Sequence, residues 1–559
     1  MSFVGRLRSK TRSAARLAGR WWTDGRVPGQ STDLITSALV MSVRDVVDPV
    51  LARSLPPKGG WSRHAAHRHG GRRWVVGPTL AGSVHDLQHQ LAGSVVGCLE
   101  VAGFSPFLVE ADGRCLTFGL PVEERAAALA ALRRLPDAGT WYVRWQRGRR
   151  GGTQRLRGFR LRQAVARAER WQVVRLAPGS HDRVVGHEHG PVITFWALGP
   201  LDRRELVGVR GLERFPAADS PTVEEIDGRP YRGTASLPVS GSVRRAEFPI
   251  DIVYTWVDGA DPSWREQREH WSGRQSAAAS DATLESRFTS RDELLFSLRS
   301  IHRNAGWVRR IFVVTAGQRP DWLVEDDRLR VVDHSEIFPA EWLPTFNSHS
   351  IESRLHHVPG LSEHFLYFND DFFLGEPVAP TDFFTGNGLP IFFEGEAKVP
   401  PSGESSEPLL GVDAGAVNGQ ALIRARFGRV IDRKLLHAPY ALRRSVLAEA
   451  ESEFADVFRT TGSSRFRATT DVSIASAFAH HYGWCTGRAV PGTITTKYVN
   501  LENVILGRHL QQLRRRRPLT FCLNETEAVP HGEVLERQLD EFLSSYFPWS
   551  SPWERPAGG

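Results

Sequence analysis

The sequence predicts an α/β protein whose C-terminal half is built on a mainly parallel sheet with helices on both faces. An apolar, β-branched strand opens FPIDIVYTWVDGADPSW (248–264). A capped amphipathic helix, RDELLFSLRSIHRNAGW (291–307), follows it. Two more buried strands come next, in RRIFVVTAG (309–317) and HFLYFNDDFFLG (364–375). Alternation of strands and helices is typical of parallel sheets, and it therefore predicts this fold class.

The N-terminal half predicts a smaller α/β or α+β module. Helical spacing of apolar residues is found in SVHDLQHQLAGSVVGCLEVAGF (83–104) and in EERAAALAALRRL (123–135). Alternating or continuous apolar residues in TWYVRWQR (140–147) and GPVITFWALG (190–199) predict strands. This mixture of helices and strands indicates a module separate from the C-terminal sheet.

Composition sets the expected domain boundaries. The N-terminal region is rich in Arg, Gly and Pro, and its cluster of His64, His67 and His69 lacks the carboxylate or Cys support of a metal site. The segment DSPTVEEIDGRPYRGTASLPVSGSV (219–243) is rich in Pro, Gly and Ser, which is typical of a linker. We expect a basic, partly flexible segment (1–80), an accessory α+β module (81–218), a linker (219–245) and a C-terminal domain (246–547).

The rest of the C-terminal domain is less regular. Within 376–430, the stretch GEAKVPPSGESSEPLLG is predicted as a loop, either a lid or substrate-binding insertion or an ordinary surface loop. Helical patterns return at 439–458 and 470–482. Four arginines and a short strand occupy 514–526, and an amphipathic helix is expected at 533–547.

Charge narrows the classes of partner. The chain of 559 residues carries a net charge of +8, which favours phosphate-bearing molecules, acidic polymers or anionic membrane surfaces. No zinc finger, helix-turn-helix or aromatic RNA-binding signature is present, so we expect no nucleic-acid partner. The four cysteines form no C-x-x-C pair and no disulfide framework.

The N-terminal residues indicate where in the cell the protein is expected. No signal-peptide core follows the first arginines, and no run of about 18 apolar residues occurs, so we expect a cytoplasmic protein. Apolar residues between Phe3 and Trp22 interleave with the arginines, which predicts either a membrane-surface helix on the inner face of the cell membrane or a solvated arm.

Carboxylates follow two of the predicted strands. Asp258 comes after the first, and Asn369, Asp370 and Asp371 come after the third. Ligands of open α/β sheets bind beyond the carboxyl ends of the strands. One or two carboxylates at such a place can hold Mg²⁺ beside substrate phosphates. Turn formation is the alternative role for these residues.

A polar cluster in FNSHSIESRLHH (346–357) provides further candidates for substrate binding. Asn347 or Ser348 can cap a helix, and His349 and Glu352 lie within it. The spacing does not fit a zinc motif, so substrate binding or acid–base chemistry is the better interpretation.

Three later positions complete the candidate set. His437 precedes a helix and can act as a general base or as a capping or packing residue. Arg465 and Arg467 precede a second helix, expected to be capped by Thr470 or Asp471, and suit phosphate binding. Asn524 and Glu525 follow a short strand and are possible metal or phosphate ligands.

The order of these segments resembles the Stealth family. IDIVYTWVDGADPSW is similar to its first conserved region. SRFTSRDELLFSLRSIHRNAGWVRRIFVVTAGQRPDWL, with FNSHSIESRLHHVPGLSEHFLYFNDDFFLG, is similar to the second. HAPYALRRSVLAEAESEFADVF through RFRATTDVSIASAFAHHY is similar to the third, and RPLTFCLNET to the fourth. Four ordered blocks across about 248–530 make the resemblance far more specific than any single motif.

The resemblance implies a Rossmann-like core and a divalent metal, Mg²⁺ or Mn²⁺. It also implies transfer of hexose 1-phosphate, such as N-acetylglucosamine 1-phosphate, from a UDP-sugar donor to a glycan or polysaccharide hydroxyl, with release of UMP. Capsular or cell-surface polysaccharide synthesis is the expected setting. The family's key acidic residues correspond to Asp258 and to Asp371 with Asp370, its His to His437 and its Arg to Arg467. The fourth block commonly reads C-L-N-D, whereas this chain has Glu525 at the last position.

These residues combine into one hypothesis. Asp370 and Asp371, with Asn524 or Glu525, would hold the metal, Arg467 would neutralise the phosphate, and His437 would deprotonate the acceptor. Two alternatives stay open. An ordinary glycosyltransferase would release UDP, and a non-enzymatic protein that binds anionic polymers would need neither nucleotide-sugar nor metal.

Overall fold

The computed structural model describes most of the chain beyond residue 81. The described ranges are 66–69, 72–75, 82–158, 161–178, 184–186, 188–198, 205–207, 214–216, 220–273, 288, 290–400, 411–525 and 532–555. The chain divides into two compact units, Met1–Trp74 and Val75–Gly559. In the first part, strands β1 (Ala66–His69) and β2 (Arg72–Val75) pair with each other. The predicted membrane-surface segment between Phe3 and Trp22 lies outside the described residues.

The accessory module is built on one mixed sheet. Its main strand order is β12-β11-β10-β7-β5-β6, with β4 pairing in parallel with β10 and β3 pairing with β4. These strands are β3 (Phe107–Ala111), β4 (Leu116–Pro121), β5 (Trp141–Arg147), β6 (Arg150–Arg155), β7 (Arg170–Arg175), β10 (Val192–Leu198), β11 (Glu205–Val207) and β12 (Arg214–Pro216). A separate short pair joins β8 (Ala177–Pro178) to β9 (Val184–Val185).

Three helices accompany this sheet: α3 (Val84–Val101), α4 (Arg125–Leu132) and α5 (Leu161–Val165). A capping box between Ser83 and Asp86 begins α3. Its buried Leu91 and Val95 belong to the same apolar core as Trp171 in β7. The two helices and two strands predicted here are therefore present, within a few residues of their expected bounds.

The prediction that residues 219–245 form a linker is wrong for residues 221–234, about half of the segment. Strands β13 (Pro221–Ile226) and β14 (Arg229–Thr234) form an antiparallel hairpin there. Asp227 and Gly228 form its tight turn with φ of 52° and 72°, a conformation that Asp-Gly favours. Ile226 and Tyr231 pack in one apolar cluster with Phe118 of the module. Its Pro and Gly residues thus belong to a packed hairpin.

The C-terminal domain has a five-stranded sheet in the order β17-β16-β15-β18-β22. The strands are β15 (Ile250–Thr255), β16 (Ile311–Thr315), β17 (Leu329–Asp333), β18 (His364–Asn369) and β22 (Tyr440–Arg443). The first four are parallel, and β22 runs antiparallel to β18. A mainly parallel α/β sheet is therefore confirmed.

The order in which strands are added to the sheet reverses at β15. The chain proceeds outward from β15 through β16 to β17, then returns to form β18 on the other side of β15. The carboxyl ends of β15 and β18 are therefore neighbours, with Thr255 opposite Asn369 in the register. Such a reversal is where open α/β sheets bind ligands.

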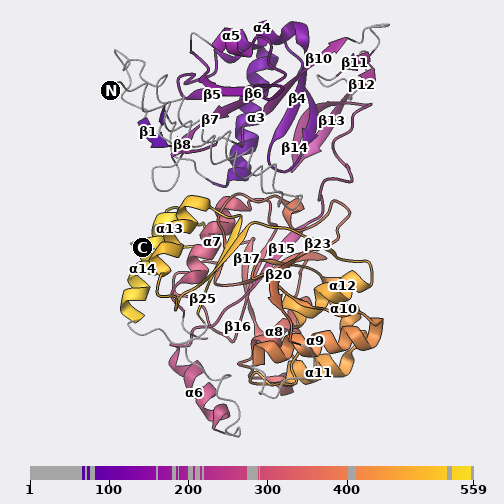
Figure 1. Cartoon of the computed structure of the whole chain (residues 1–559), viewed down its shortest axis with the longest axis vertical. Coiled ribbons are helices and arrows are strands. Elements are labelled where there is room, and N and C mark those ends of the chain that lie inside the picture. Colours follow the sequence, from indigo (N-terminus) through magenta and orange to yellow (C-terminus); the bar gives the residue numbers. More distant parts are fainter. Residues whose placement is uncertain are drawn as a thin grey trace, which may run out of the picture. The chain divides into compact units, whose positions relative to one another are not determined.

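Helices cover both sides of this sheet (Figure 1). On one side is α7 (Glu293–Asn304), with α13 (Leu506–Arg516) and α14 (Gly532–Tyr546) next to it in a separate apolar cluster around Phe373 and Phe521, and on the other are α9 (Gly411–Phe427), α10 (Arg444–Glu453), α11 (Ala455–Ser463) and α12 (Ala479–Cys485). The predicted cap of α7 differs, because Asp292 has a φ of 60° and its side chain makes no cap hydrogen bond. It accepts instead from Trp322 Nε1 at 3.3 Å.

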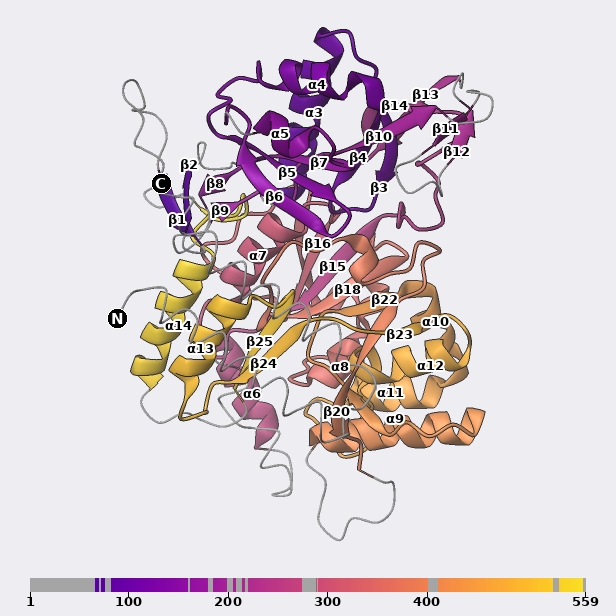
Figure 2. The same cartoon turned by 45° about the horizontal axis from the view of Figure 1, so that its top comes forward.

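Shorter elements complete the domain (Figure 2). They are α6 (Pro262–Ser272), α8 (Ser348–Glu352), a π-helix (Ile474–Phe478), the sheet of β19 (Phe372–Leu374), β25 (Thr520–Asn524) and β24 (Thr496–Asn500), and the sheet of β21 (Arg433–Leu435), β20 (Ile391–Lys398) and β23 (Val490–Gly492). The first four residues of the loop expected within 376–430 belong to β20 and its last residue, Gly411, begins α9, while residues 401–410 lie outside the described residues. Among the described helices, none combines the length and apolar character needed to cross a bilayer. All four cysteines are free.

Candidate active site

A cavity of about 490 Å³ lies at the carboxyl ends of β15 and β18. Its walls come from the ends of these strands and of β25, and from α7, α8, α9 and the π-helix. Nine of the twelve predicted site residues line it: His349, Glu352, Asn369, Asp370, Asp371, His437, Arg467, Asn524 and Glu525. The fold therefore collects residues from widely separated segments into one place.

Asp371 is fixed by the pairing of β19 with β25. In that antiparallel register Phe372 is opposite Cys522, and Leu523 N donates to the Asp371 carbonyl oxygen at 3.1 Å. Asp371 Oδ2 accepts from Asn524 Nδ2 at 3.1 Å and from Cys522 Sγ at 3.2 Å. Asp371 Oδ1 is buried without a hydrogen-bond partner. One oxygen of this carboxylate is thus held in place while the other has no protein donor.

A cluster of carboxylates surrounds Asp371. Desolvation raises the pKa of Asp370 well above its ordinary range, and the charges of Glu293 and Asp371 add to that effect. Desolvation also raises the pKa of Asp371, against its hydrogen bonds from Asn524 and Cys522. Desolvation also raises the pKa of Glu293, at the start of α7, to about 7. Crowded carboxylates with one orphaned oxygen fit a site for a divalent cation.

Glu525 is held differently from its neighbours. It forms an ion pair with Arg291, and both side chains are largely buried. The backbone N–H of Arg291 also donates to Glu293 Oε2 at 2.6 Å. Because a guanidinium already neutralises Glu525, Asp371 with Asn524 is the better place for a cation.

His437 lies beside this acidic cluster at the exposed side of the cavity. Its ring centroid is 5.0 Å from that of Tyr498 and 6.4 Å from that of Phe372. Desolvation lowers the pKa of His437, the charge of Asp371 acts in the opposite direction, and that of Lys434 lowers it further. The lowered pKa favours the neutral imidazole, which can accept a proton.

Arg467 reaches the cavity from the segment before the π-helix. Its Nη2 donates to Ser348 Oγ, the first residue of α8, at 2.6 Å. Asn347 connects α8 to the segment that carries Arg467. Its Oδ1 accepts from His349 N at 3.1 Å, and its Nδ2 donates to Asp471 Oδ2 at 2.8 Å. Asn347 is almost completely buried and does not line the cavity, so it is a positioning residue.

The predicted cap of the second helix is not formed as expected. The helical segment begins with the π-helix at Ile474, after Thr470 and Asp471. Asp471 is fully buried and accepts from Ala468 N at 2.8 Å as well as from Asn347. It therefore shapes the turn that carries Arg467.

His349 and Glu352 connect α8 to the π-helix and its preceding residue. His349 Nε2 lies 3.1 Å from Ser473 Oγ. Glu352 Oε2 accepts from the backbone N–H of Ser476 at 3.1 Å and from its hydroxyl at 2.8 Å. Both residues line the cavity and are buried, so they can contact a ligand and also fix its wall.

Asp258 and Arg465 do not line the cavity. Asp258 Oδ1 accepts from Ala260 N at 2.8 Å, and the Asp258 backbone exchanges hydrogen bonds with the Gln318 side chain. Asp258 thus takes the role of turn former that its sequence also allowed. The Arg465 guanidinium lies over the ring of Trp271, 4.1 Å from its centroid.

Several lining residues were missed by the sequence reasoning. Arg291 and Glu293 stand at the start of a predicted helix, where charged residues are ordinary. Lys434 pairs with Asp413 of α9, and Tyr498 OH donates to Asn524 Oδ1 at 3.1 Å. No local pattern singles out these residues, because their roles depend on partners far along the chain.

The C-terminal domain is thus an α/β domain with charged side chains gathered in a cavity at the place where open α/β sheets bind ligands. Four family regions match this chain: Stealth conserved region 1 at residues 248–276, region 2 at 287–392, region 3 at 436–483 and region 4 at 511–559.

Similar proteins agree with that match. One exopolysaccharide phosphotransferase of Streptomyces coelicolor is 41% identical over 517 residues, covering 87% of this chain and 85% of that protein. Another from the same organism is 44% identical over 400 residues, covering 68% and 73%. The exopolysaccharide phosphotransferase CpsY of Mycobacterium tuberculosis is 40% identical over 315 residues, covering 56% and 59%. The chain belongs to the Stealth family.

Proposed function

We propose that this protein is a phosphotransferase that moves hexose 1-phosphate from a UDP-sugar to a hydroxyl of a polysaccharide, with release of UMP. The observation that carries the proposal is one cavity that holds the Asp370–Asp371 cluster, His437 and Arg467 together. The family membership and the names of the similar proteins support phosphotransfer in polysaccharide synthesis. A cavity of this size is within the usual range for small-molecule sites.

The strand order supports a Rossmann-like character for the domain. Numbered along the chain, the parallel strands lie in the order 3-2-1-4, the order of doubly wound nucleotide-binding sheets. The diphosphate of a nucleotide-sugar would then occupy the reversal between β15 and β18. The carboxylates and Arg467 line the cavity at that place.

Asp371, with Asn524 beside it, would hold Mg²⁺ or Mn²⁺, which when bound neutralises charge on the diphosphate. Within the described residues, the clusters with three His or carboxylate atoms mutually within 4.8 Å lie elsewhere. A looser set is what Mg²⁺ uses when substrate phosphates and waters complete its octahedron. Arg467 would bind the transferred phosphate through its guanidinium.

His437 would take the proton of the acceptor hydroxyl. The acceptor oxygen then forms a bond to the sugar-bearing phosphorus, and the bond from that phosphorus to the UMP oxygen breaks. The bond between the sugar and its oxygen is not touched, so the anomeric configuration is kept. A neutral imidazole at the exposed side of the cavity suits this step.

The test is UMP release from a panel of UDP-sugars with Mg²⁺ and a polysaccharide acceptor. His437→Ala and Asp371→Ala should each lose most of the activity. His270→Ala and Asp456→Ala remove exposed residues outside the cavity and serve as controls. Full activity in both cavity variants would refute the assignment. Release of UDP would indicate an ordinary glycosyltransferase, and polymer binding indifferent to UDP-sugar and Mg²⁺ would indicate a non-enzymatic protein.

A further inference from the structure

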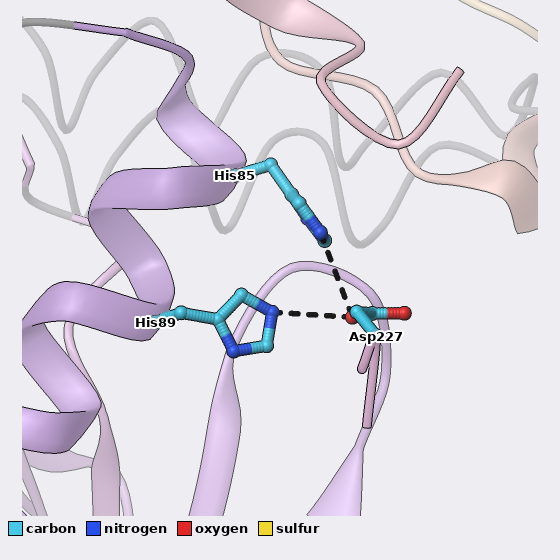
Figure 3. A group of neighbouring side chains, drawn as sticks. All are labelled: His85, His89 and Asp227. Carbon is cyan, nitrogen blue, oxygen red and sulfur yellow. Dashed lines mark hydrogen bonds and ion pairs between the residues drawn. The ribbon is translucent and has the colours of Figure 1, made fainter. Parts of the chain in front are cut away.

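A second cluster of ligand-type side chains lies in the accessory module, apart from the cavity (Figure 3). His85 and His89 are one turn apart on α3, so both rings project from the same side of the helix. Asp227 is at the tip of the β13–β14 hairpin and points between them. None of the three lines the cavity.

The three side chains converge on one point. Asp227 Oδ2 lies 3.2 Å from His89 Nε2 and 3.6 Å from His85 Nε2. All three ligand atoms are within 4.8 Å of one another. Tetrahedral Zn²⁺ with bonds of ~2.0–2.1 Å places its ligand atoms roughly 3.3 Å apart. The two measured separations lie on either side of that value, so a small adjustment would complete the geometry.

Tyr231 contacts the His89 ring on the side away from the cluster. Its hydroxyl lies 2.7 Å from His89 Nδ1, the ring nitrogen that faces away from Asp227. If His89 Nδ1 carries the proton and donates it to this oxygen, the lone pair of Nε2 is directed at the cluster. A second hydrogen bond of this kind is the usual support of a metal-bound His.

The surroundings leave room for a fourth ligand. The His89 side chain is 1% exposed, whereas those of His85 and Asp227 are 17% and 36% exposed. Water can therefore reach the open side of the cluster. Arg245 lies 3.7 Å from the other oxygen of Asp227, but it is already bonded to Glu247 at 2.7 Å and to the Ala111 carbonyl oxygen at 2.8 Å.

A second group of two His and one carboxylate, on the C-terminal domain, lacks the features of a zinc site. His356 and His357 both contact Glu451 Oε2, at 2.7 and 2.8 Å. Arg354 forms an ion pair with the other oxygen of Glu451. A guanidinium bonded directly to the carboxylate already supplies the positive charge, so this group is a complete ion-pair network.

We propose that His85, His89 and Asp227 form a Zn²⁺ site with water as fourth ligand. Two imidazoles and a carboxylate are a ligand set suited to zinc. The metal would join α3 to the β13–β14 hairpin and add to its other contacts with the module, which include the apolar cluster of Ile226 and Tyr231 and the Arg229–Asp86 ion pair. The segment after this hairpin leads directly into β15, so the site would hold the chain where it enters the C-terminal domain.

The test measures Zn²⁺ binding to the untagged full-length chain after removal of metal with a chelator. Titration against a chromophoric chelator gives stoichiometry and affinity, and Co²⁺ gives a visible spectrum that reports tetrahedral geometry. The variants are His85→Ala, His89→Ala, Asp227→Asn and Tyr231→Phe. Asn tolerates the left-handed conformation of Asp227, so Asp227→Asn preserves the turn and removes the charge.

We expect one tightly bound Zn²⁺ per chain. Each of the three ligand variants should weaken binding by more than about 100-fold, and Tyr231→Phe by roughly 10–100-fold. His270→Ala, at an exposed position on α6, should bind as the wild type does. A variant with His64, His67 and His69 all changed to Ala should also keep the site.

Three results would overturn the proposal. The wild type could take up no stoichiometric Zn²⁺, the ligand variants could bind as it does, or binding could vanish in the variant lacking His64, His67 and His69. Far-ultraviolet circular dichroism identifies any variant that fails to fold. If His89→Ala is such a variant, His85→Ala, at a partly exposed position, and the turn-compatible Asp227→Asn still decide the question.

Discussion

Glu293→Gln tests the electrostatics of the cavity directly. Glu293 is the first residue of α7 and is 7% exposed. Desolvation raises its pKa from 4.5 to about 7, and the charge of Asp371 contributes to the rise. Glutamine keeps an oxygen that can accept from the Arg291 backbone N–H and removes the titratable proton.

The size of the effect follows from the two pKa values. Between pH 4.5 and pH 7 the folded chain keeps a proton that the unfolded chain has lost, so the wild-type free energy of unfolding falls as pH rises through this window. At about 1.4 kcal/mol per pH unit, the loss reaches about 3 kcal/mol above pH 7. The glutamine variant has no such loss. It should therefore be more stable than the wild type by about 3 kcal/mol at pH 8 and similar to it near pH 4.5.

Thermal unfolding in a metal chelator, from pH 4.5 to pH 8, measures the difference. The Tm of the variant should exceed that of the wild type by an amount that grows with pH. Glu536→Gln changes an exposed residue of α14 and should give no such trend. A Tm difference that does not vary with pH would refute a raised pKa at Glu293.

Three further substitutions test the cavity and the sheet. Arg467→Lys should lower kcat/KM for UMP release by about 10–100-fold, because a lysine ammonium binds phosphate as a point charge and cannot reproduce the planar, two-pronged contact of a guanidinium. Gly415→Ala should raise KM for the donor several-fold with the fold retained, because the new Cβ would lie 2.9 Å from His349 Cε1. Asp251→Ala should cost about 2–4 kcal/mol in urea unfolding, because it leaves the backbone N–H groups of Arg310 and Ser362 without their buried acceptor.

Each of these has a matched control. Arg459→Lys changes an exposed arginine of α11, and its kcat/KM should stay at the wild-type value. Gly507→Ala lies on α13 outside the cavity, where a Cβ meets nothing within 4 Å, so a rise in KM equal to that of Gly415→Ala would refute the steric explanation. Asp456→Ala removes an exposed carboxylate, and a stability loss as large as that of Asp251→Ala would show that burial is not the cause.

The predicted strands of the C-terminal sheet correspond to β15, β16 and β18, because each is a continuous apolar run bounded by polar residues. The short strand β17 was not predicted, since five residues with alternating exposure give a weak local signal. The hairpin of β13 and β14 was also missed. Its turn at Asp227 is a recognisable Asp-Gly signal, but the burial of Tyr231 depends on α3.

The sequence by itself determined the fold class of the C-terminal domain, the family blocks and nine of the residues that line the cavity. These depend on local periodicity and on motifs of contiguous residues. It also pointed to the carboxylates after β18, because the ends of parallel strands share one edge of a sheet.

Only the tertiary structure decided which partner each side chain has. The register of β19 against β25 brings Asn524 and Cys522 to Asp371, and folding pairs Glu525 with Arg291. Three other predicted positions do not line the cavity: Asp258 forms a turn, Asn347 bonds to Asp471, and Arg465 lies over Trp271. The physical reason is that hydrogen bonds and ion pairs act over a few ångströms. Their energies depend on segments that the chain brings together only when it folds.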